Sequence, residues 1–399
     1  MPSYFTSSPG KVILFGEHAV VYGKVATAGS LGLRSYALIQ TREDKKIEVN
    51  LPDVQLARSW NITDVPRQAR WEGYPYPPQS MNTELLAQLT KFVDLGSQTN
   101  RSQAAIALLY LHSFLTTDET LEQGYDFVVR SNLPVGAGLG SSASYSVCVA
   151  TALLQLNGYL AKEIGLDVAA QRDLVNQWAF QAEKVIHGNP SGIDNTVSTL
   201  GGAVMFKKGE KIEPLPGFQS LRFLLTNTRV PRETQVQVAN VRKLHDKFPT
   251  VVNPMLDAIN EISNSCKAIF SQDGMDRAHL LARFGELVDV NHALLVALGV
   301  SHPSLEKVRE ISSKLGLKSK LTGAGGGGCA LTLIRDDVTS ETVAVVKQLL
   351  EAEGFQCMET SVGGPGAGIL TLAQPTSISE FLAHDKPYFE ATQNWAYFV

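Results

Sequence analysis

The chain has few of the features that assign a protein to a class at once. It has only four cysteines, which lie far apart and match no metal-site spacing: Cys148, Cys266, Cys329 and Cys357. We therefore expect reduced, mostly buried thiols in a cytosolic protein. No uninterrupted apolar run reaches membrane length, and no basic segment followed by an apolar one opens the chain. We expect neither a membrane protein nor a signal peptide.

An excess of basic residues is also missing. The formal net charge is −4 at pH 7, which argues against general nucleic-acid binding, so an anionic substrate must be held by local positive groups. The C-terminal Tyr-Phe-Val is neither a prenylation box nor the peroxisomal address Ser-Lys-Leu. The content of 44% hydrophobic and 19% charged residues is typical of a globular protein, and 399 residues allow two domains.

The P-loop pattern G-x-x-x-x-G-K-[ST] is absent, but another glycine loop is present. It reads Leu133-Pro-Val-Gly-Ala-Gly-Leu-Gly-Ser-Ser142 and runs into a long apolar helix. Alternating glycines let the backbone approach a ligand and turn its N–H groups inward, and the helix start adds unpaired N–H groups. A serine hydroxyl at this point can ligate Mg²⁺. The loop therefore predicts a polyphosphate site.

A second glycine tract, Gly323-Ala-Gly-Gly-Gly-Gly328, formally matches G-x-G-x-x-G. A dinucleotide-binding fold requires a helix after this motif, whereas residues 329–334 have the character of a strand. We reject that interpretation. The tract is better explained by a close approach of its backbone to bound phosphates or to the first glycine loop.

The apolar pattern predicts an α+β chain of two units with a break near residues 215–230. Strands are expected at 11–15, 34–41, 47–51, 126–130, 203–206, 221–226, 329–334, 355–361 and 368–373. Helical spacing is expected over 82–115, 142–160, 168–186, 340–353 and most of 227–315, with breaks at Pro254, 272–274 and Pro303. Residues 54–80 read as irregular, and the last 25 residues show no clear element.

Polar residues flank the first apolar strand. Lys11 precedes it, and Glu17 and His18 follow it. For Lys11 alone, a solvated strand end is the favoured interpretation, and Glu17-His18 is compatible with a simple turn.

A second group spans Glu183, His187 and Asp194. Two carboxylates eleven residues apart across a Gly-Pro-Gly loop can converge on one cleft, where one holds a metal and the other takes a proton. The alternative is that Glu183 is a solvated helix residue and Asp194 an N-cap. His187 is favoured as a helix-end residue that complements the helix dipole.

Two more candidates lie further along the chain. Arg232 and Thr234 could meet a carboxylate or phosphate, although Thr234 could equally cap a helix, and Lys320 could be an ordinary surface lysine. Together, a phosphate loop, a metal carboxylate, a candidate base and a lysine indicate phosphoryl transfer, which depends mainly on positioning and charge neutralisation.

Three motifs occur in order: Pro9-Gly-Lys-Val-Ile-Leu-Phe-Gly-Glu-His18, Pro134-Val-Gly-Ala-Gly-Leu-Gly-Ser-Ser-Ala143 and Lys320-Leu-Thr-Gly-Ala-Gly-Gly-Gly-Gly-Cys329. With them the chain resembles the GHMP kinases, most closely the mevalonate kinase family, over residues 5–372. The resemblance extends to the stretch from Glu183 to Asn195, to Val230-Pro-Arg232 and to Asn291-His292. It implies an N-terminal domain similar to the second domain of ribosomal protein S5 over 1–222, a ferredoxin-like C-terminal domain over 223–372, and a tail over 373–399.

The resemblance also implies roles for single residues. The ATP phosphates would be bound by Gly136, Ala137, Gly138, Leu139, Gly140, Ser141 and Ser142, with Lys11 and Ser131 near the nucleotide. Ser142 and Glu183 would ligate Mg²⁺. Asp194 would take the proton from the substrate hydroxyl, and Lys11 would favour its ionisation and neutralise developing charge. His18 and Thr234 would hold the substrate. Asp53 stands where the family often has Asn, which leaves that nucleotide contact open.

The implied reaction is ATP- and Mg²⁺-dependent phosphorylation of the C5 hydroxyl of (R)-mevalonate to 5-phosphomevalonate, in isoprenoid and sterol biosynthesis. The resemblance favours a cytoplasmic homodimer with no nucleic-acid or membrane partner. A peroxisomal pool and feedback inhibition by isoprenoid diphosphates are left open.

Other members of the superfamily compete with this interpretation. Phosphomevalonate kinase would share the glycine loop. A galactokinase would continue differently after Glu17-His18, where this chain has Ala19-Val-Val-Tyr22. Diphosphomevalonate decarboxylases are not expected to carry Lys11 with Glu17 and His18, and a homoserine kinase would lack the base. A catalytically inactive nucleotide-binding regulator would be favoured by loss of Asp194, Lys11 or Glu183, all of which are present.

Overall fold

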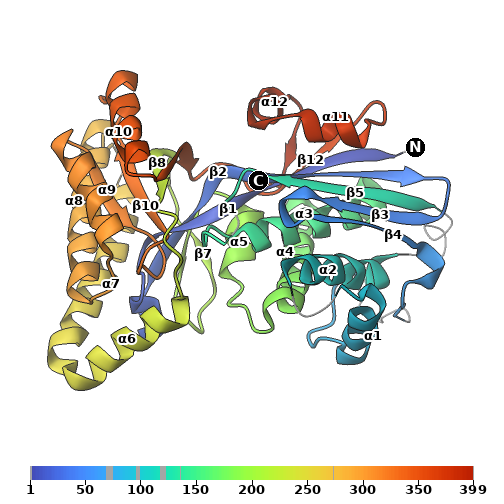
Figure 1. The fold of residues 1–399 in the computed structure, drawn as a ribbon, viewed down its shortest axis with the longest axis horizontal. Coiled ribbons are helices and arrows are strands. Elements are labelled where there is room, and N and C mark those ends of the chain that lie inside the picture. The colour runs from blue at the N-terminus through green and yellow to red at the C-terminus, as the bar shows by residue number, and fades with distance from the viewer. Residues whose placement is uncertain are drawn as a thin grey trace.

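The computed structural model describes residues 2–68, 75–95, 99–116, 123–134, 136–272 and 274–398, which form an α+β fold of two lobes (Figure 1). The fold class expected from the sequence is therefore confirmed. Residues 69–74 of the segment expected to be irregular, Val135 of the first glycine loop and Asp273 of an expected turn lie outside the described residues.

The strands join one extended sheet and are, in chain order, β1 (Ser3–Phe15), β2 (Ala26–Arg42), β3 (Lys46–Leu51), β4 (Leu56–Asn61), β5 (Gly124–Ser131), β6 (Ala203–Phe206), β7 (Glu213–Pro214), β8 (Leu221–Asn227), β9 (Lys318–Leu321), β10 (Cys329–Ile334), β11 (Gln356–Val362), β12 (Gly368–Thr371) and β13 (Ala396–Tyr397).

The α-helices are α1 (Thr83–Val93), α2 (Asn100–Leu115), α3 (Ser141–Leu156), α4 (Val168–His187), α5 (Ile193–Leu200), α6 (Thr234–Lys247), α7 (Pro249–Ser271), α8 (Arg277–Ala297), α9 (Pro303–Lys314), α10 (Ser340–Ala352), α11 (Ile378–Ala383) and α12 (Lys386–Ala391). Short 3₁₀ turns include η1 (Ala19–Tyr22) and η2 (Pro52–Val54). No helix of the described residues has the length and apolar character needed to cross a membrane.

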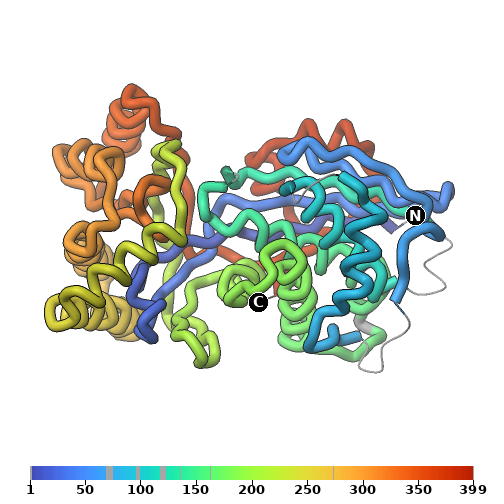
Figure 2. Tube along the Cα trace, turned by 60° about the horizontal axis from the view of Figure 1, so that its bottom comes forward, coloured from blue at the N-terminus to red at the C-terminus, as the bar shows by residue number. Residues whose placement is uncertain are grey.

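The long strands β1 and β2 connect the two lobes, as the traces in Figures 1 and 2 show. They pair antiparallel from Ser3↔Gln40 to Phe15↔Thr27, with register shifts between Pro9 and Lys11 and between Ile13 and Phe15. Along its length β2 also pairs with β5, β6 and β11. The second lobe holds β8 between β10 and β11, together with α6 to α10.

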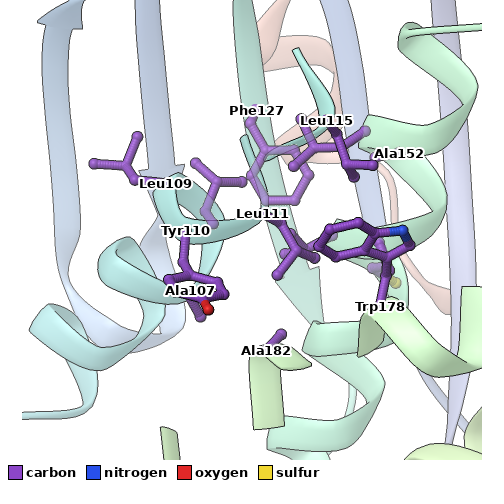
Figure 3. Packing of buried hydrophobic residues seen from close by; sticks show 14 of the residues in the cluster. Ala107, Leu109, Tyr110, Leu111, Leu115, Phe127, Ala152, Trp178 and Ala182 are labelled. Carbon is purple, nitrogen blue, oxygen red and sulfur yellow. The ribbon is translucent and has the colours of Figure 1, made fainter. Parts of the chain in front are cut away.

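The first lobe is organised around α3, which is buried between the sheet and the neighbouring helices α2, α4 and α5. Its residues are apolar or small on nearly all sides, which is the pattern of a fully buried helix. Figure 3 shows the adjoining core, where Leu111 and Leu115 from α2 pack near Phe127 from β5 and Trp178 from α4. This packing holds the first turn of α3 rigidly at the edge of the lobe.

The C-terminal segment corrects one expectation, because it contains α11, α12 and β13 rather than no clear element. It covers the sheet face opposite α2–α4 (Figure 1). Phe381 and Phe389 are buried there, and Phe389 stacks on Tyr36 with ring centroids 4.1 Å apart. Both helices have six residues, too short for a helical period to be read from the sequence; their partners lie far away in the chain.

Two local expectations were also wrong. Pro254 lies inside α7 and does not end it, because the buried Val252, Leu256 and Ile259 hold the helix against the loss of one hydrogen bond. The segment expected to be irregular contains β4. The helical spacing expected over 82–115 is confirmed by α1 and α2, and residues 96–98 between these helices lie outside the described residues. The first expected domain limit, at residue 222, falls within β8, and β12 returns to pair with β1, so the domain limits stay a prediction.

Candidate active site

The first glycine loop ends at an uncapped helix start. Gly140 is the N-cap of α3 with φ 73°, and no side chain accepts from the first N–H groups of the helix. Gly136 and Gly138 also have positive φ, which glycine adopts without strain. The backbone N–H of Lys11 donates to the carbonyl of Leu139 at 2.8 Å, so the loop is fastened to β1. The free N–H groups and the positive helix end form a ready anion site.

A cavity of about 550 Å³ opens in front of this helix start. Its lining combines the glycine loop with apolar side chains such as Leu51, Val54 and Val129. Its lining residues are Lys11, Ser35, Leu51, Asp53, Val54, Asn100, Gln103, Ala104, Val129, Ser131, Gly136, Gly138, Gly140, Ser141, Ser142, Tyr145, Ile186, His187, Asp194, Arg232, Thr234, Gly323 and Ala324. Most of the residues singled out in the sequence therefore meet at one cavity.

Lys11 and Asp194 form an ion pair in this cavity, with Nζ 3.1 Å from Oδ1. The Lys11 side chain is 13% exposed and lies within β1, so the interpretation as a solvated strand end was wrong. Asp194 is in the first turn of α5, whose N-cap is Gly192, so the N-cap interpretation was also wrong. A carboxylate beside a cation at the mouth of an anion site is an arrangement suited to proton transfer.

Glu183 faces the start of α3 from α4 and is 3% exposed, which excludes the solvated-helix interpretation. The hydroxyl of Ser146 donates to it at 3.0 Å and the hydroxyl of Ser142 at 3.5 Å. Burial raises the pKa of Glu183 to about 7, and the charge of Asp194 adds to this rise, while the two hydroxyls oppose it. His187 Nε2 lies 3.0 Å from Ser142 Oγ at the end of α4.

Arg232 lies between the two glycine tracts. Its guanidinium donates to the carbonyls of Ala137, at 3.0 Å, and Thr322, at 3.4 Å. A Cβ at Gly138 would overlap the guanidinium, and one at Gly323 or Gly328 would come within 3 Å of the Arg232 side chain. The second glycine tract is thus needed for a close approach, but the groups that approach it in this structure are the side chains of Arg232 and Gln237, the carbonyl of Val300 and Val230.

Of the remaining predicted residues, some line the cavity and others do not. Thr234 lines the cavity at the start of α6, whose N-cap is Glu233, so Thr234 is not a cap. The buried His18 instead lies behind the cavity wall, where its Nε2–H donates to the carbonyl of Ala324 at 2.9 Å. Ser131 lines the cavity, and its N–H donates to Asp53 at 2.8 Å. Asp53 thereby holds the end of β5 at the cavity.

A buried ion pair joins the residues after β1 to β9. Lys320 donates to Glu17, and the two side chains are 2% and 1% exposed. Asn291 of α8 also donates to Glu17 at 3.1 Å. The interpretation of Lys320 as a surface lysine was wrong. No sequence signal identified this pair, because its members are 303 positions apart. Ser146, in contrast, is one helical turn from Ser142, so helical spacing could have found it.

We expect Glu17→Gln and Lys320→Met each to destabilise the protein by about 3–5 kcal/mol, because each leaves one buried charge without its partner. The double variant should lose clearly less than the sum of the two. Urea denaturation of the wild type, the two single variants and the double variant gives the free energy by which Glu17 and Lys320 are coupled. Additive losses would mean that the pair contributes nothing as a pair.

Glu183→Gln should change how stability depends on pH in Mg²⁺-free buffer. The folded state binds the Glu183 proton more tightly than the unfolded state, whose pKa is near 4.5, so this group loses stabilisation as pH rises from 4.5 to about 7. A glutamine does not titrate. The free energy of unfolding of the variant minus that of the wild type should rise by about 3 kcal/mol from about pH 5 to about pH 8. Glu353→Gln, at an exposed position, is the matched control, and a flat difference for Glu183→Gln would contradict the burial argument.

Comparison with known proteins agrees with this geometry. The family model "GHMP kinases N terminal domain" matches residues 103–202, and "GHMP kinases C terminal" matches residues 275–346. The chain is 42% identical to the mevalonate kinase of Mus musculus over 90% of this chain and 93% of the relative. It is also 42% identical to that of Homo sapiens, over 91% and 94% of the two chains.

Solved structures show the same fold. The mevalonate kinase of Methanococcus jannaschii matches with a TM-score of 0.67 and 24% identity, over 90% of this chain and 98% of that one. The L. major mevalonate kinase in complex with R-mevalonate matches with a TM-score of 0.65 and 23% identity, over 90% and 96%. With the relatives of 42% identity, these matches lead to one conclusion: the chain belongs to the mevalonate kinase family of the GHMP kinases.

Proposed function

We propose that this protein transfers the γ-phosphoryl group of ATP to the C5 hydroxyl of (R)-mevalonate, giving 5-phosphomevalonate. The observation that carries the proposal is the Lys11–Asp194 pair, 3.1 Å apart, in a cavity that begins at an uncapped helix N-terminus. Membership of the mevalonate kinase family supports the choice of substrate.

The nucleotide would occupy the length of this cavity. The N–H groups of the loop from Gly136 to Ser142 would bind its phosphates, since the start of α3 has no competing cap. Ala137 and Leu139 do not line the cavity and would contribute through the loop backbone. The apolar lining residues would contact the base, next to Ser131 and to Asp53. Asp53 would act there by holding the backbone N–H of Ser131 in place.

The residues present fit Mg²⁺. Ser142 and Glu183 offer hydroxyl and carboxylate oxygens within 3.5 Å of each other at the phosphate end. Mg²⁺ prefers one or two such protein ligands and completes its octahedron with water and phosphate. Among the described residues no cluster of three or more His, Cys, Asp or Glu forms a full protein cage. When bound, Mg²⁺ would neutralise phosphate charge, while Ser146 keeps the Glu183 carboxylate oriented at 3.0 Å.

The proton and the developing charge would be handled by this chain's own side chains. Asp194 would accept the hydroxyl proton as the oxygen attacks, and Lys11 would stabilise both the carboxylate and the nascent alkoxide. Arg232 adds a second cation at the glycine loops and suits the transferring phosphoryl group. Thr234, which lines the cavity, would hold substrate, whereas His18 would act through the Ala324 backbone that it supports.

The family also favours a homodimer in the cytoplasm. Feedback inhibition by isoprenoid diphosphates would act at the same cavity, where the glycine loop would bind the diphosphate and the apolar lining residues would contact the hydrocarbon chain. A competition assay in which an isoprenoid diphosphate and ATP bind the purified protein tests whether this inhibition acts at the cavity.

Asp194→Asn should lower kcat by ~10²–10⁴-fold while ATP binding changes little, because the amide keeps the shape and cannot take the proton. A coupled ADP-release assay with mevalonate, phosphomevalonate, galactose and homoserine should show turnover with mevalonate in the wild type. Asp167→Asn, at the exposed N-cap of α4 where asparagine caps equally well, is the matched control. Turnover of another substrate in preference to mevalonate would refute the proposed reaction. A wild-type kcat in Asp194→Asn would show that Asp194 is not the general base.

Lys11→Met should lower kcat at least ~10-fold and weaken ATP binding, because the charge beside Asp194 and the phosphates is lost. The fold should survive, since the aliphatic stem still packs against the glycine loop. Both quantities are measured on one preparation, with circular dichroism as the folding check and Lys208→Met, at an exposed position, as the control. A folded Lys11→Met enzyme with unchanged kcat and ATP affinity would exclude Lys11 from the mechanism.

A further inference from the structure

The C-terminal end of α5, the helix that carries Asp194, is locked to a glycine-rich loop from the far end of the chain. The N–H of Gly202 donates to the carbonyl of Gly364 at 2.8 Å, and the N–H of Ala367 donates to the carbonyl of Thr199 at 3.0 Å. A Cβ at Gly366 would overlap the Thr199 carbonyl. The loop and the helix end therefore pack backbone to backbone, with no room for a side chain between them.

A buried arginine holds this loop in place. Arg34 of β2 is 7% exposed, and its guanidinium donates to the carbonyls of Pro365, at 2.7 Å, and Gly366, at 2.5 Å. Among the described residues no carboxylate lies within ion-pair distance of Arg34, and burial lowers its pKa, while the charge of Glu390 opposes this change. A buried cation without an ion-pair partner is costly unless its donors are used elsewhere. Here the donors satisfy the carbonyls of Pro365 and Gly366, which adds to the backbone hydrogen bonds of the loop.

The same arginine is tied to the strand that carries Lys11. Its Nε donates to the hydroxyl of Ser7 in β1 at 2.7 Å. The next residue, Ser8, donates to the carbonyl of Ser198 near the end of α5 at 3.2 Å. Helix α5 has eight residues and is about 12 Å long, so a shift at one end is carried to the other. The position of Asp194 relative to Lys11 therefore depends on this junction.

The last residues of the chain close over the junction. Tyr397 of β13 pairs with Gly368, and its ring centroid lies 5.6 Å from the guanidinium carbon of Arg34. The N–H of Phe398 donates to the carbonyl of Ala367 at 3.1 Å. These contacts exclude water from the guanidinium and fasten the loop from its outer side.

We propose that Arg34 is a positioning residue for the phosphoryl transfer: it holds α5 in register with β1, so that Asp194 stays at Lys11, and the C-terminal strand secures it. This inference rests on the proposed function. It also gives the segment beyond residue 372, which lies outside the motif resemblance, a role in holding Asp194 in position for that reaction.

The test compares Arg34→Met and Arg34→Lys with Leu350→Ala, which removes a buried side chain of α10 far from α5 and serves as the control for lost stability. For Arg34→Met we expect kcat to fall ~10- to 100-fold, as for a small misplacement of a reacting group, with KM for ATP and mevalonate within about twofold. Arg34→Lys, which can still donate to one carbonyl, should recover part of kcat.

Hydrogen exchange separates this inference from the proposed function. In Arg34→Met, amides of α5 should exchange faster than in Leu350→Ala at an equal loss of melting temperature. If the α5 amides exchange faster in Arg34→Met but the protein does not phosphorylate mevalonate, the role of Arg34 in holding α5 is supported and the proposed function is refuted. Wild-type kcat and α5 protection in Arg34→Met would overturn the inference. If that variant does not fold, Ser7→Ala and Tyr397→Ala, which each remove one contact, take its place, and wild-type kcat with wild-type α5 protection in both would overturn it equally.

Discussion

The antiparallel pairing of β1 with β2 brings together the groups on which the proposed chemistry depends. β1 carries Lys11 and leads into Glu17, while Arg34 stands on β2 opposite Pro9. The register shift between Pro9 and Lys11 interrupts the alternation of side chains, as a bulge does, and places Lys11 at the glycine loop. Because the two strands span both lobes, a displacement of one lobe relative to the other would change the geometry of the cavity.

Charges buried around these strands act in different ways. The opposite charges of Glu17 and Lys320 neutralise each other and join the end of β1 to β9. Arg232 and Arg34 have no carboxylate partners among the described residues and instead satisfy backbone carbonyls. For Arg232 this leaves a net positive charge beside an anion cavity, whereas Arg34 is shielded from the cavity by packing. Placing a charge in a low-dielectric site strengthens its interactions and raises the cost of leaving it unpaired, so each is held by several contacts.

The two glycine tracts are best understood together. The first provides N–H groups at the start of α3, and the second lets Arg232 reach them from the opposite side. The separation of the two tracts by nearly two hundred residues explains why the sequence predicted a close approach at the second tract without showing which group made it.

The sequence by itself determined the local elements and the chemistry of the motifs. Strands 203–206 and 329–334 match β6 and β10, and alternating glycines before a long apolar helix predicted the anion site at α3, because these features depend on neighbouring residues. Tertiary structure alone decided which polar groups were buried. Glu183 and Lys320 each had an ordinary interpretation as solvated residues, and only long-range packing excluded it. The same holds for Arg34 and for the C-terminal helices, whose partners lie hundreds of residues away. Burial and pairing at such distances depend on the folded sheet, which no local pattern encodes.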